Sequence, residues 1–304
     1  MGNDLLQLGD DTFEEQRYVE ATEIYMRAAE AAKSAGEIAA EAESLAQVAR
    51  GLLIQGRREE GRSWLQRAIR LARPGHPSAW SRVLDVRGRF EWRASDREAA
   101  ATTFDALYRY CLAHGLFIRA IDAARMAAIV EPPSEQLAWA QRAIAAAEAG
   151  DARSWLGTLW GDLACTLDAL ERYAEALEAR LKAREHLTGS ANDRDRLVAE
   201  WWVGRAYRRA GDFNEARACM LPVKAWAERR HDAAPDDDTA EWLALCCWEV
   251  GELDAQAGQR ETGQLQMQQA RAMMRAAGVE ERWPDGMARL DRRLAALHAP
   301  AEAG

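Results

Sequence analysis

The stretch VGRAYRRAGDFNEA, residues 203–216, contains the signal on which the fold prediction depends. Its two small residues, Gly204 and Ala216, lie 12 positions apart on either side of the turn signal Gly211-Asp212. Small residues at such positions let two packed helices approach closely, where a larger side chain would separate them. The stretch therefore predicts two antiparallel helices joined by a short turn.

Pairs of small residues with the same spacing recur along the chain. The other pairs are Gly9 and Ala21, Ala49 and Gly61, Gly88 and Ala100, Ala164 and Ala176, and Gly251 and Gly263, with Ala124 and Gln136 as a weaker pair. Each pair follows the previous one after 36 to 47 residues, most often after 40. Good helix formers dominate between the pairs, and alternating β-branched stretches are absent. The chain is therefore expected to be a row of helical hairpins.

Larger residues occupy fixed positions in the same frame. Aromatic residues stand three positions before the second small residue (Tyr18, Tyr173, Phe213), and Tyr25, Phe104 and Met267 stand four after it. With Trp160-Gly161-Asp162-Leu163-Ala164 and the opening stretch, this pattern resembles the tetratricopeptide repeat (TPR) family. The step near 40 exceeds the standard 34 and is similar to the longer repeats of bacterial signalling regulators and kinesin light chains. The resemblance implies an all-α, right-handed superhelical solenoid that acts by binding other proteins.

We expect seven hairpins that form a single solenoid over residues 1–304, without domain boundaries. The predicted helices are 3–15/18–34, 37–55/58–73, 77–93/96–113, 116–130/134–149, 152–170/173–188, 193–210/213–230 and 238–257/260–276. A final helix over 285–298 should cover the open end, and the tail 299–304 should fray. Pro222 falls inside a predicted helix, where it favours a kink or an early end.

Composition restricts the class of protein. The chain is 48% hydrophobic and 29% charged, and no apolar run is long enough to span a membrane. Its N-terminus is acidic where a signal peptide would be basic, and its five cysteines are odd in number without a Cys-x-x-Cys pair. We therefore expect a cytoplasmic protein with reduced thiols. The net charge of −9, with 37 arginines and three lysines, argues against nucleic-acid or membrane partners.

Motifs for chemistry are not found. Five histidines form no metal-binding pattern, and the glycine-rich phosphate loops and the nucleophile elbow are absent. The expectation is therefore a protein that is not an enzyme and that has no cofactor and no metal. Asp232 and Asp236 to Asp238 could attract a cation, but carboxylates at a helix start more often cap it. The vicinal Cys246 and Cys247 are expected in the core rather than as a redox pair.

The residue after the first small position of each repeat is expected to face the groove of a TPR superhelix. Those residues are Asp10, Arg50, Arg89, Arg125, Cys165, Arg205 and Glu252, and four of the seven are arginine. We predict a peptide-binding groove formed by these arginines and their neighbours: Arg50, Arg82, Arg89, Trp92, Arg93, Arg125, Trp201, Arg205, Arg208 and Trp248. Guanidinium groups bind carboxylates with paired hydrogen bonds, and tryptophans add flat apolar contact.

The leading hypothesis is an intracellular protein-interaction module, with a scaffold or regulatory role, that binds an acidic peptide segment or a partner protein in this groove. One alternative is a sensor of a small phosphorylated or anionic ligand gripped by the same arginines. A second is a structural adaptor that assembles through its convex or edge surfaces, with homo-oligomers included. Arginine stems can also cover apolar surface, and the overall arginine and alanine content is what a GC-rich genome produces without any function.

Overall fold

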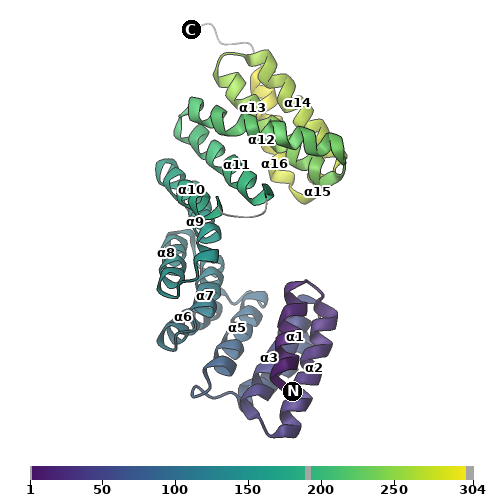
Figure 1. Cartoon of the computed structure of the whole chain (residues 1–304), viewed down its shortest axis with the longest axis vertical. Helices are drawn as coiled ribbons and strands as arrows, with labels where there is room; N and C mark the ends of the chain where they lie inside the picture. Colours follow the sequence, from purple (N-terminus) through teal and green to yellow (C-terminus); the bar gives the residue numbers. More distant parts are fainter. Residues whose placement is uncertain (1, 189–192, 299–304) are drawn as a thin grey trace. The chain divides into compact units, whose positions relative to one another are not determined.

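The computed structural model describes residues 2–188 and 193–298, and all regular structure in these two ranges is α-helical (Figure 1). The tail predicted to fray lies outside the described residues. Contacts divide the chain into two compact units, Met1–Leu159 and Trp160–Gly304. The expectation of a single solenoid stays a prediction, and each unit is described by itself.

Unit 1 is a series of helical hairpins in which each helix packs against the next. Its helices are α1 (Gly2–Glu14), α2 (Tyr18–Ala35), α3 (Ile38–Ile54), α4 (Arg58–Leu71), α5 (Pro77–Arg93), α6 (Arg97–Ala113), α7 (Phe117–Val130) and α8 (Pro133–Ala149). The boundary between the units falls inside the next helix, α9 (Arg153–Ala169), whose residues up to Leu159 belong to unit 1. The first helices of successive hairpins also touch, since α1 contacts α3, α3 contacts α5 and α5 contacts α7. We call these four the A helices of unit 1, and they form one continuous row.

Unit 2 continues the same pattern. Its further helices are α10 (Tyr173–Leu187), α11 (Asp193–Ala210), α12 (Phe213–Ala233), α13 (Asp237–Gln256), α14 (Arg260–Ala276), α15 (Val279–Arg282) and α16 (Pro284–His298). All fourteen hairpin helices and the final helix lie within a few residues of the predicted bounds, so the helical assignment is confirmed. The one-turn helix α15 was not predicted. It follows Gly278, whose left-handed φ of +66° separates it from the end of α14.

The small residues have the predicted role in packing. A Cβ atom added at Gly88 would lie 2.8 Å from the Phe104 ring, and one added at Gly9 would lie 2.5 Å from the Tyr25 ring. At Gly263 the obstacle is backbone, because an added Cβ would lie 2.4 Å from the Gly251 carbonyl oxygen. Contacts below 3 Å are repulsive, so the two helices of each of these hairpins can approach this closely only without the side chain.

The structure tests three further local predictions: the aspartate cap, the break at Pro222 and the burial of the vicinal cysteines. Asp236 caps α13, since its carboxylate accepts a hydrogen bond from the Thr239 N–H at 2.7 Å and the Thr239 hydroxyl accepts one from the Asp236 N–H. Capping by the aspartate cluster is therefore confirmed at Asp236. An early end at Pro222 is wrong, because α12 continues to Ala233. Cys246 and Cys247 are buried in the core, as predicted.

Candidate functional site

Charged side chains form a network across the A helices of unit 1. We define the unit 1 network as four arginines and four carboxylates: Arg50, Arg82, Arg89, Arg119, Asp10, Glu43, Asp85 and Asp122. Arg82 on α5 pairs with Asp10 on α1, and its Nε lies 3.3 Å from Oε1 of Glu43 on α3. Arg119 on α7 reaches the same Glu43 oxygen at 2.7 Å. The network therefore joins all four A helices.

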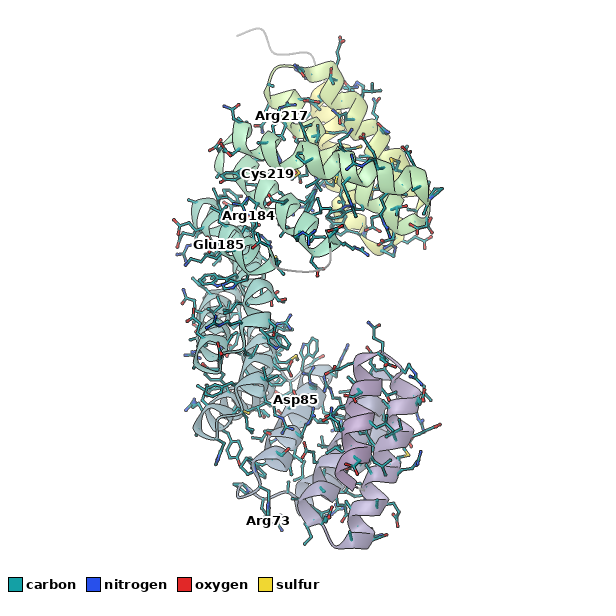
Figure 2. The ribbon with its side chains drawn as sticks, viewed as in Figure 1. Arg73, Asp85, Arg184, Glu185, Arg217 and Cys219 are labelled. Atoms are coloured by element: carbon teal, nitrogen blue, oxygen red, sulfur yellow. The ribbon has the colours of Figure 1, made fainter. Side chains whose placement is uncertain are left out.

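The second half of the unit 1 network is centred on Asp85, which lies on α5 (Figure 2). The Arg89 guanidinium donates from Nε to Asp85 at 2.8 Å and from Nη2 to Asp122 on α7 at 2.6 Å. Arg50 lies over the Phe13 ring at 4.5 Å, and its buried Nε has no hydrogen-bond partner in the described chain. Burial would raise the pKa of Asp85, but the charges of Arg89 and Arg50 outweigh burial and lower it. Asp85 is therefore ionised at neutral pH.

Neutral polar groups complete the Asp10 end of the network. The Tyr25 hydroxyl donates to Asp10 at 2.7 Å, and Gln47 donates to the same oxygen at 2.6 Å. Burial, and then the charge of Asp10, raise the pKa of Tyr25, so the phenol stays protonated and remains a donor. Asp10 therefore has hydrogen bonds from two neutral donors besides its arginine partner.

A cleft of about 960 Å³ lies beside this end of the network, and we call it the N-terminal cleft. Its lining comes from α1, the turn before α3, the first half of α3, the start of α5 with the residue before it, and α7. The lining residues are Leu6, Gln7, Asp10, Gly36, Glu37, Ile38, Ala39, Ala40, Glu43, His76, Pro77, Ser78, Ala79, Arg82 and Arg119. Ile38 is 57% exposed there, which is unusual for a large aliphatic side chain. The cleft thus combines apolar walls with ion-paired arginines.

Unit 2 contains a second set of paired arginines. Arg205 and Arg208 on α11 share Glu249 on α13, at 3.1 and 2.6 Å from their Nε atoms. Burial lowers the pKa of Arg205 more than Glu249 raises it, whereas Glu249 outweighs burial at Arg208. Arg209 pairs with Asp168 on α9 at 2.8 Å.

Arg180 on α10 is the exception in unit 2. Its side chain is buried (5% exposed), and among the described residues no carboxylate lies within ion-pair distance. Nη2 donates to the Cys165 sulfur at 3.0 Å, the guanidinium lies 4.0 Å from the Trp202 ring centre, and the buried Nε has no partner. A buried charge without a counter-charge is costly. The equivalent position holds Tyr25, Leu65, Phe104, Met220 and Met267 in other repeats.

Nine of the ten predicted groove residues fall into three groups: arginines in ion-paired networks, residues of arginine–tryptophan contacts, and Trp248. Arg50, Arg82, Arg89, Arg205 and Arg208 lie in the paired networks just described. Trp92 is half-buried under the exposed Arg93, whose guanidinium lies 4.9 Å from its ring centre, and Arg125 lies 5.8 Å from the Trp155 ring centre. Trp248 is half-buried and donates to Glu252 at 3.4 Å.

The placement of Trp201 on the groove surface is wrong. Its side chain is buried (5% exposed) and its ring packs against Trp202 and Trp242 at 4.8 and 5.7 Å. Trp201 lies three positions before the small residue Gly204, and α11 contacts α13 directly, so this side of α11 is covered by the next hairpin. An indole in that place contributes to the core instead of presenting a surface.

The sequence prediction missed the acidic half of these networks. Asp85 could have been found, because it lies four residues before Arg89 and such pairs share one face of a helix. Glu43, Asp122 and Glu249 pair with arginines 33 to 76 positions away, and no local pattern indicates those partners. Arg119 and Arg180 were missed for the same reason: their side chains reach a neighbouring helix rather than the predicted row.

Among the described residues, no cluster of three or more histidine, cysteine, aspartate or glutamate side chains has the arrangement of a metal site. None of the helices in this part of the chain combines the length and the apolar character needed to cross a bilayer.

No protein-family model and no curated protein matches the sequence. Solved structures do match. The signal-transduction ATPase with numerous domains from Pyrococcus horikoshii, which has a tetratricopeptide repeat sensor, matches at a TM-score of 0.71 and 13% identity over 96% of this chain and 44% of that one. This chain therefore spans less than half of that protein's length.

Two other structures match at comparable identity. The apo form of RapI matches at a TM-score of 0.61 and 10% identity, over 96% of this chain and 85% of its own. BtubC from P. vanneervenii matches at 0.55 and 14% identity, over 78% of this chain and 94% of its own. At such identities the similarity concerns the fold alone. Taken with the helical pairs and their small-residue contacts, it shows that the chain has a helical-repeat fold similar to that of tetratricopeptide repeats.

Proposed function

We propose that this chain is a protein-interaction module, with a scaffold or regulatory role, that binds a peptide segment or a partner protein on the A helices of unit 1. The single observation that supports this site most is the N-terminal cleft, which the exposed Ile38 lines together with Arg82 and Arg119. Protein interfaces combine a few apolar anchors with a polar surround that fixes orientation. The activity proposed is therefore binding rather than catalysis.

The charges of the cleft restrict its guest. Arg82 and Arg119 already have carboxylate partners in Asp10 and Glu43, and their side chains are only 19% and 26% exposed. An acidic segment, as the sequence predicts, would have to share or replace Asp10 or Glu43 at these arginines. We therefore propose a guest with an apolar anchor against Ile38 and an acidic side chain near Arg119, the more exposed of the two arginines. The gain from its charge should be modest, because the unit 1 network is balanced.

The structural neighbours supply an analogy in support. The Pyrococcus horikoshii protein carries its repeats as a sensor, according to its description. A sensor recognises another molecule through its repeats, and the same kind of role is proposed for this chain. The analogy rests on the fold, so the particular guest has to be found by experiment.

The experiment is a selection of peptides from a random library on the purified protein, followed by measurement of Kd for the selected peptides. Ile38→Ser removes the apolar anchor and should weaken binding about 10-fold or more. Arg119→Gln should weaken peptides with an acidic residue by several-fold and leave their neutral analogues unchanged. Arg87→Gln is the matched control, since Arg87 lies on α5 but is absent from the cleft lining and half-exposed.

Equal affinities in all four proteins would remove the N-terminal cleft as the site. Light scattering on the same samples addresses the adaptor hypothesis, because assembly that the Ile38→Ser and Arg119→Gln substitutions leave unchanged would indicate a convex or edge surface.

A further inference from the structure

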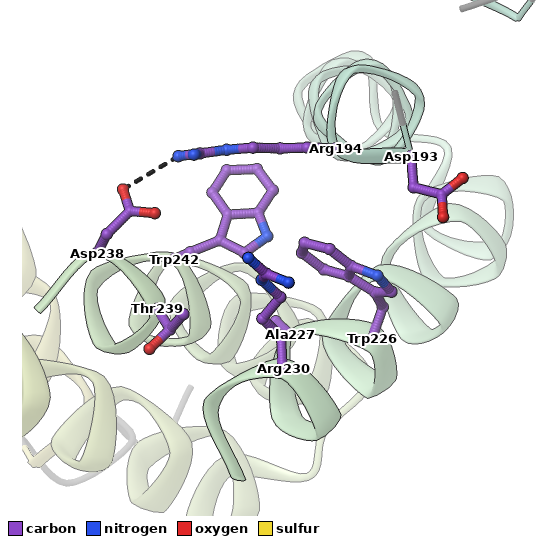
Figure 3. A pocket seen from close by; sticks show the side chains of 8 residues that line it. All are labelled: Asp193, Arg194, Trp226, Ala227, Arg230, Asp238, Thr239 and Trp242. Atoms are coloured by element: carbon purple, nitrogen blue, oxygen red, sulfur yellow. Dashed lines mark hydrogen bonds and ion pairs between the residues drawn. The ribbon is translucent and has the colours of Figure 1, made fainter. Parts of the chain in front are cut away.

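The arginines of unit 2 differ in their exposure and in their partners. At a small pocket formed by α11, α12 and α13, Arg194 pairs with the carboxylate of Asp238 at 3.0 Å, and Arg230 lies between two indoles (Figure 3). Both arginines are exposed, so water screens their charge. Arg180 on α10 is different, because its side chain is buried and no carboxylate of the described chain pairs with it. Its hydrogen-bond acceptor is the sulfur of Cys165.

Cys165 is also unlike the other cysteines of the chain. All five lie in the described ranges, and Cys165 alone is exposed. Burial raises the pKa of Cys111, Cys219, Cys246 and Cys247, to about 11 in the half-buried Cys219. A thiol with a raised pKa carries little thiolate, which is the nucleophilic form. Cys165 is therefore the thiol that a reagent in solution can reach most easily.

The guanidinium of Arg180 is directed at the Cys165 sulfur from the protein side. Nη2 donates to the sulfur at 3.0 Å, and the guanidinium lies 4.0 Å from the Trp202 ring centre. Its Nε is buried and has no hydrogen-bond partner within the described residues. A hydrogen bond from a charged donor is strongest to an anionic acceptor. A thiolate at Cys165 would thus supply the counter-charge that the buried guanidinium lacks.

The carboxylates near this pair have partners of their own. Asp162 and Asp168 lie one turn before and one turn after the cysteine on α9, and both already interact with other groups. On the neighbouring α11, Arg205 pairs with Glu249. None of these three carboxylates lies within ion-pair distance of Arg180. The charge of Arg180 therefore remains available to the sulfur.

We propose that Cys165 is a redox-reactive thiol, activated by Arg180, and that hydrogen peroxide is its oxidant. This oxidant is small and neutral, so it needs no binding pocket beyond an exposed sulfur. The thiolate sulfur attacks one peroxide oxygen, and an S–O bond forms as the O–O bond breaks. The sulfur loses two electrons and becomes a sulfenic acid, while the leaving hydroxide takes up a proton to give water.

The product can return to the thiol. A second thiol from solution converts a sulfenic acid into a mixed disulfide with loss of water, and a further thiol then releases the cysteine. The site lies in unit 2, and it does not depend on the function proposed for the N-terminal cleft.

The test treats the reduced full chain with hydrogen peroxide in the presence of dimedone, which traps sulfenic acids as stable thioethers. Mass spectrometry gives the rate of trapping at each cysteine. We expect Cys165 to be trapped at least about 10-fold faster than any other cysteine, and Cys165→Ser to abolish this fast reaction. Dithiothreitol added before the dimedone should restore the free thiol.

Arg180→Met tests the role of the guanidinium, because it fills the same position with an apolar side chain. We expect trapping at Cys165 to slow about 10-fold, since a charge-assisted hydrogen bond to the thiolate is lost. Arg172→Met is the matched control, because Arg172 directly precedes α10 and pairs with Glu175 at an exposed position. Circular dichroism checks that each variant is folded.

A second measurement separates charge from exposure. Alkylation by anionic iodoacetate and by neutral iodoacetamide depends equally on access to the sulfur, but neighbouring positive charge attracts only iodoacetate. The ratio of the two rates at Cys165 should exceed that of 2-mercaptoethanol by at least about 3-fold and should fall in Arg180→Met. Trapping no faster at Cys165 than at the buried cysteines, equal rates in Arg180→Met and Arg172→Met, or a ratio equal to that of 2-mercaptoethanol would each overturn the proposal.

Discussion

The paired arginines of unit 1 and those of unit 2 start from the same sequence signal and end in different environments. In unit 1, four arginines lie among four carboxylates. Glu43 forms ion pairs with two arginines, and the charge of Asp85 interacts with two others. In unit 2, Arg205 and Arg208 share the single carboxylate of Glu249, and the buried Arg180 has a thiol and an indole face instead of a counter-charge.

This difference teaches that a row of arginines in a repeat sequence does not establish a basic surface. The charge of a face is decided by the acids that neighbouring helices bring to it. In the unit 1 network the arginine charges are matched by carboxylates, so these arginines stabilise the packing of the A helices as much as they contribute to any binding. Among the described residues, unit 2 retains a buried guanidinium without a counter-charge at Arg180.

The strongest way to break the unit 1 network is Asp85→Asn. This substitution keeps the shape of the side chain and leaves the buried Arg89 and Arg50 without their central charge. We expect a loss of about 3–5 kcal/mol in the free energy of unfolding, measured by urea titration. Asp122→Asn is the comparator, because Asp122 is much more exposed and should cost about 1 kcal/mol or less. Equal losses would contradict the central role of Asp85.

The same network should make the free energy of unfolding fall at acid pH. Burial raises the pKa of Asp85, but Arg89 and Arg50 lower it further, so the folded value is below the ordinary 3.8. A lowered carboxylate pKa adds stability above the unfolded value and loses it as the pH falls through the folded value. In Asp85→Asn, stability between pH 4 and pH 2, followed by circular dichroism, should fall less steeply than in the wild type.

In unit 2 the corresponding substitution is Glu249→Gln. It removes the shared partner of Arg205 and Arg208, both of which are largely buried. The expected loss in unfolding free energy is about 2–4 kcal/mol, less than for Asp85 because both guanidinium groups keep some access to solvent. Glu228→Gln serves as control, since its pair with Lys224 is half-exposed. A loss as small as that of the control would show that Glu249 is not needed for charge balance.

Replacement of Arg180 should have the opposite sign. Arg180→Met introduces the residue that Met220 and Met267 supply at the equivalent position of later repeats, and it removes a buried charge that lacks a counter-charge. We expect the free energy of unfolding to rise by about 1–3 kcal/mol, with a higher Tm in differential scanning calorimetry. The exposed Arg172→Met should leave Tm unchanged. A lower Tm for Arg180→Met would mean that the contacts of this guanidinium with Trp202 and Cys165 outweigh the cost of burying its charge.

Cys111 provides a smaller, pH-dependent contrast. Burial raises the pKa of its thiol to about 12, above the ordinary 9.0. A raised pKa of this kind adds stability that is complete below the unfolded value and is lost as the pH rises through the folded one. Unfolding free energy should therefore fall by about 1 kcal/mol between pH 8 and pH 9.5. The Cys111→Ala variant should show a shallower decline, and an identical decline would rule out this thiol as the cause.

The smallest effect is expected at an exposed pair of unit 1. Arg87→Gln breaks the contact of Arg87 with Glu91, a neighbour one turn further along α5, at a half-exposed position. Such pairs contribute within about 0.5 kcal/mol, which is close to the error of a urea titration. A loss above about 1 kcal/mol would show that exposure is a poor guide to which arginines of this face matter.

The sequence determined the helices of this protein. Helix formers, turn residues and pairs of small residues act within one hairpin, so their spacing in the chain is their spacing in space. The close packing at Gly88 and Ala100, or at Gly251 and Gly263, could therefore be predicted from the sequence alone. The core position filled by Tyr25, Phe104 and Met267 follows from the same short-range geometry.

The tertiary structure decided what the arginines and tryptophans do. Whether Arg82 is free or paired depends on Asp10 and Glu43, 72 and 39 positions away, and Trp201 became core because α13 covers it. Pairing and burial depend on which side chains from other hairpins come within a few ångströms, and the one-dimensional repeat does not contain that information.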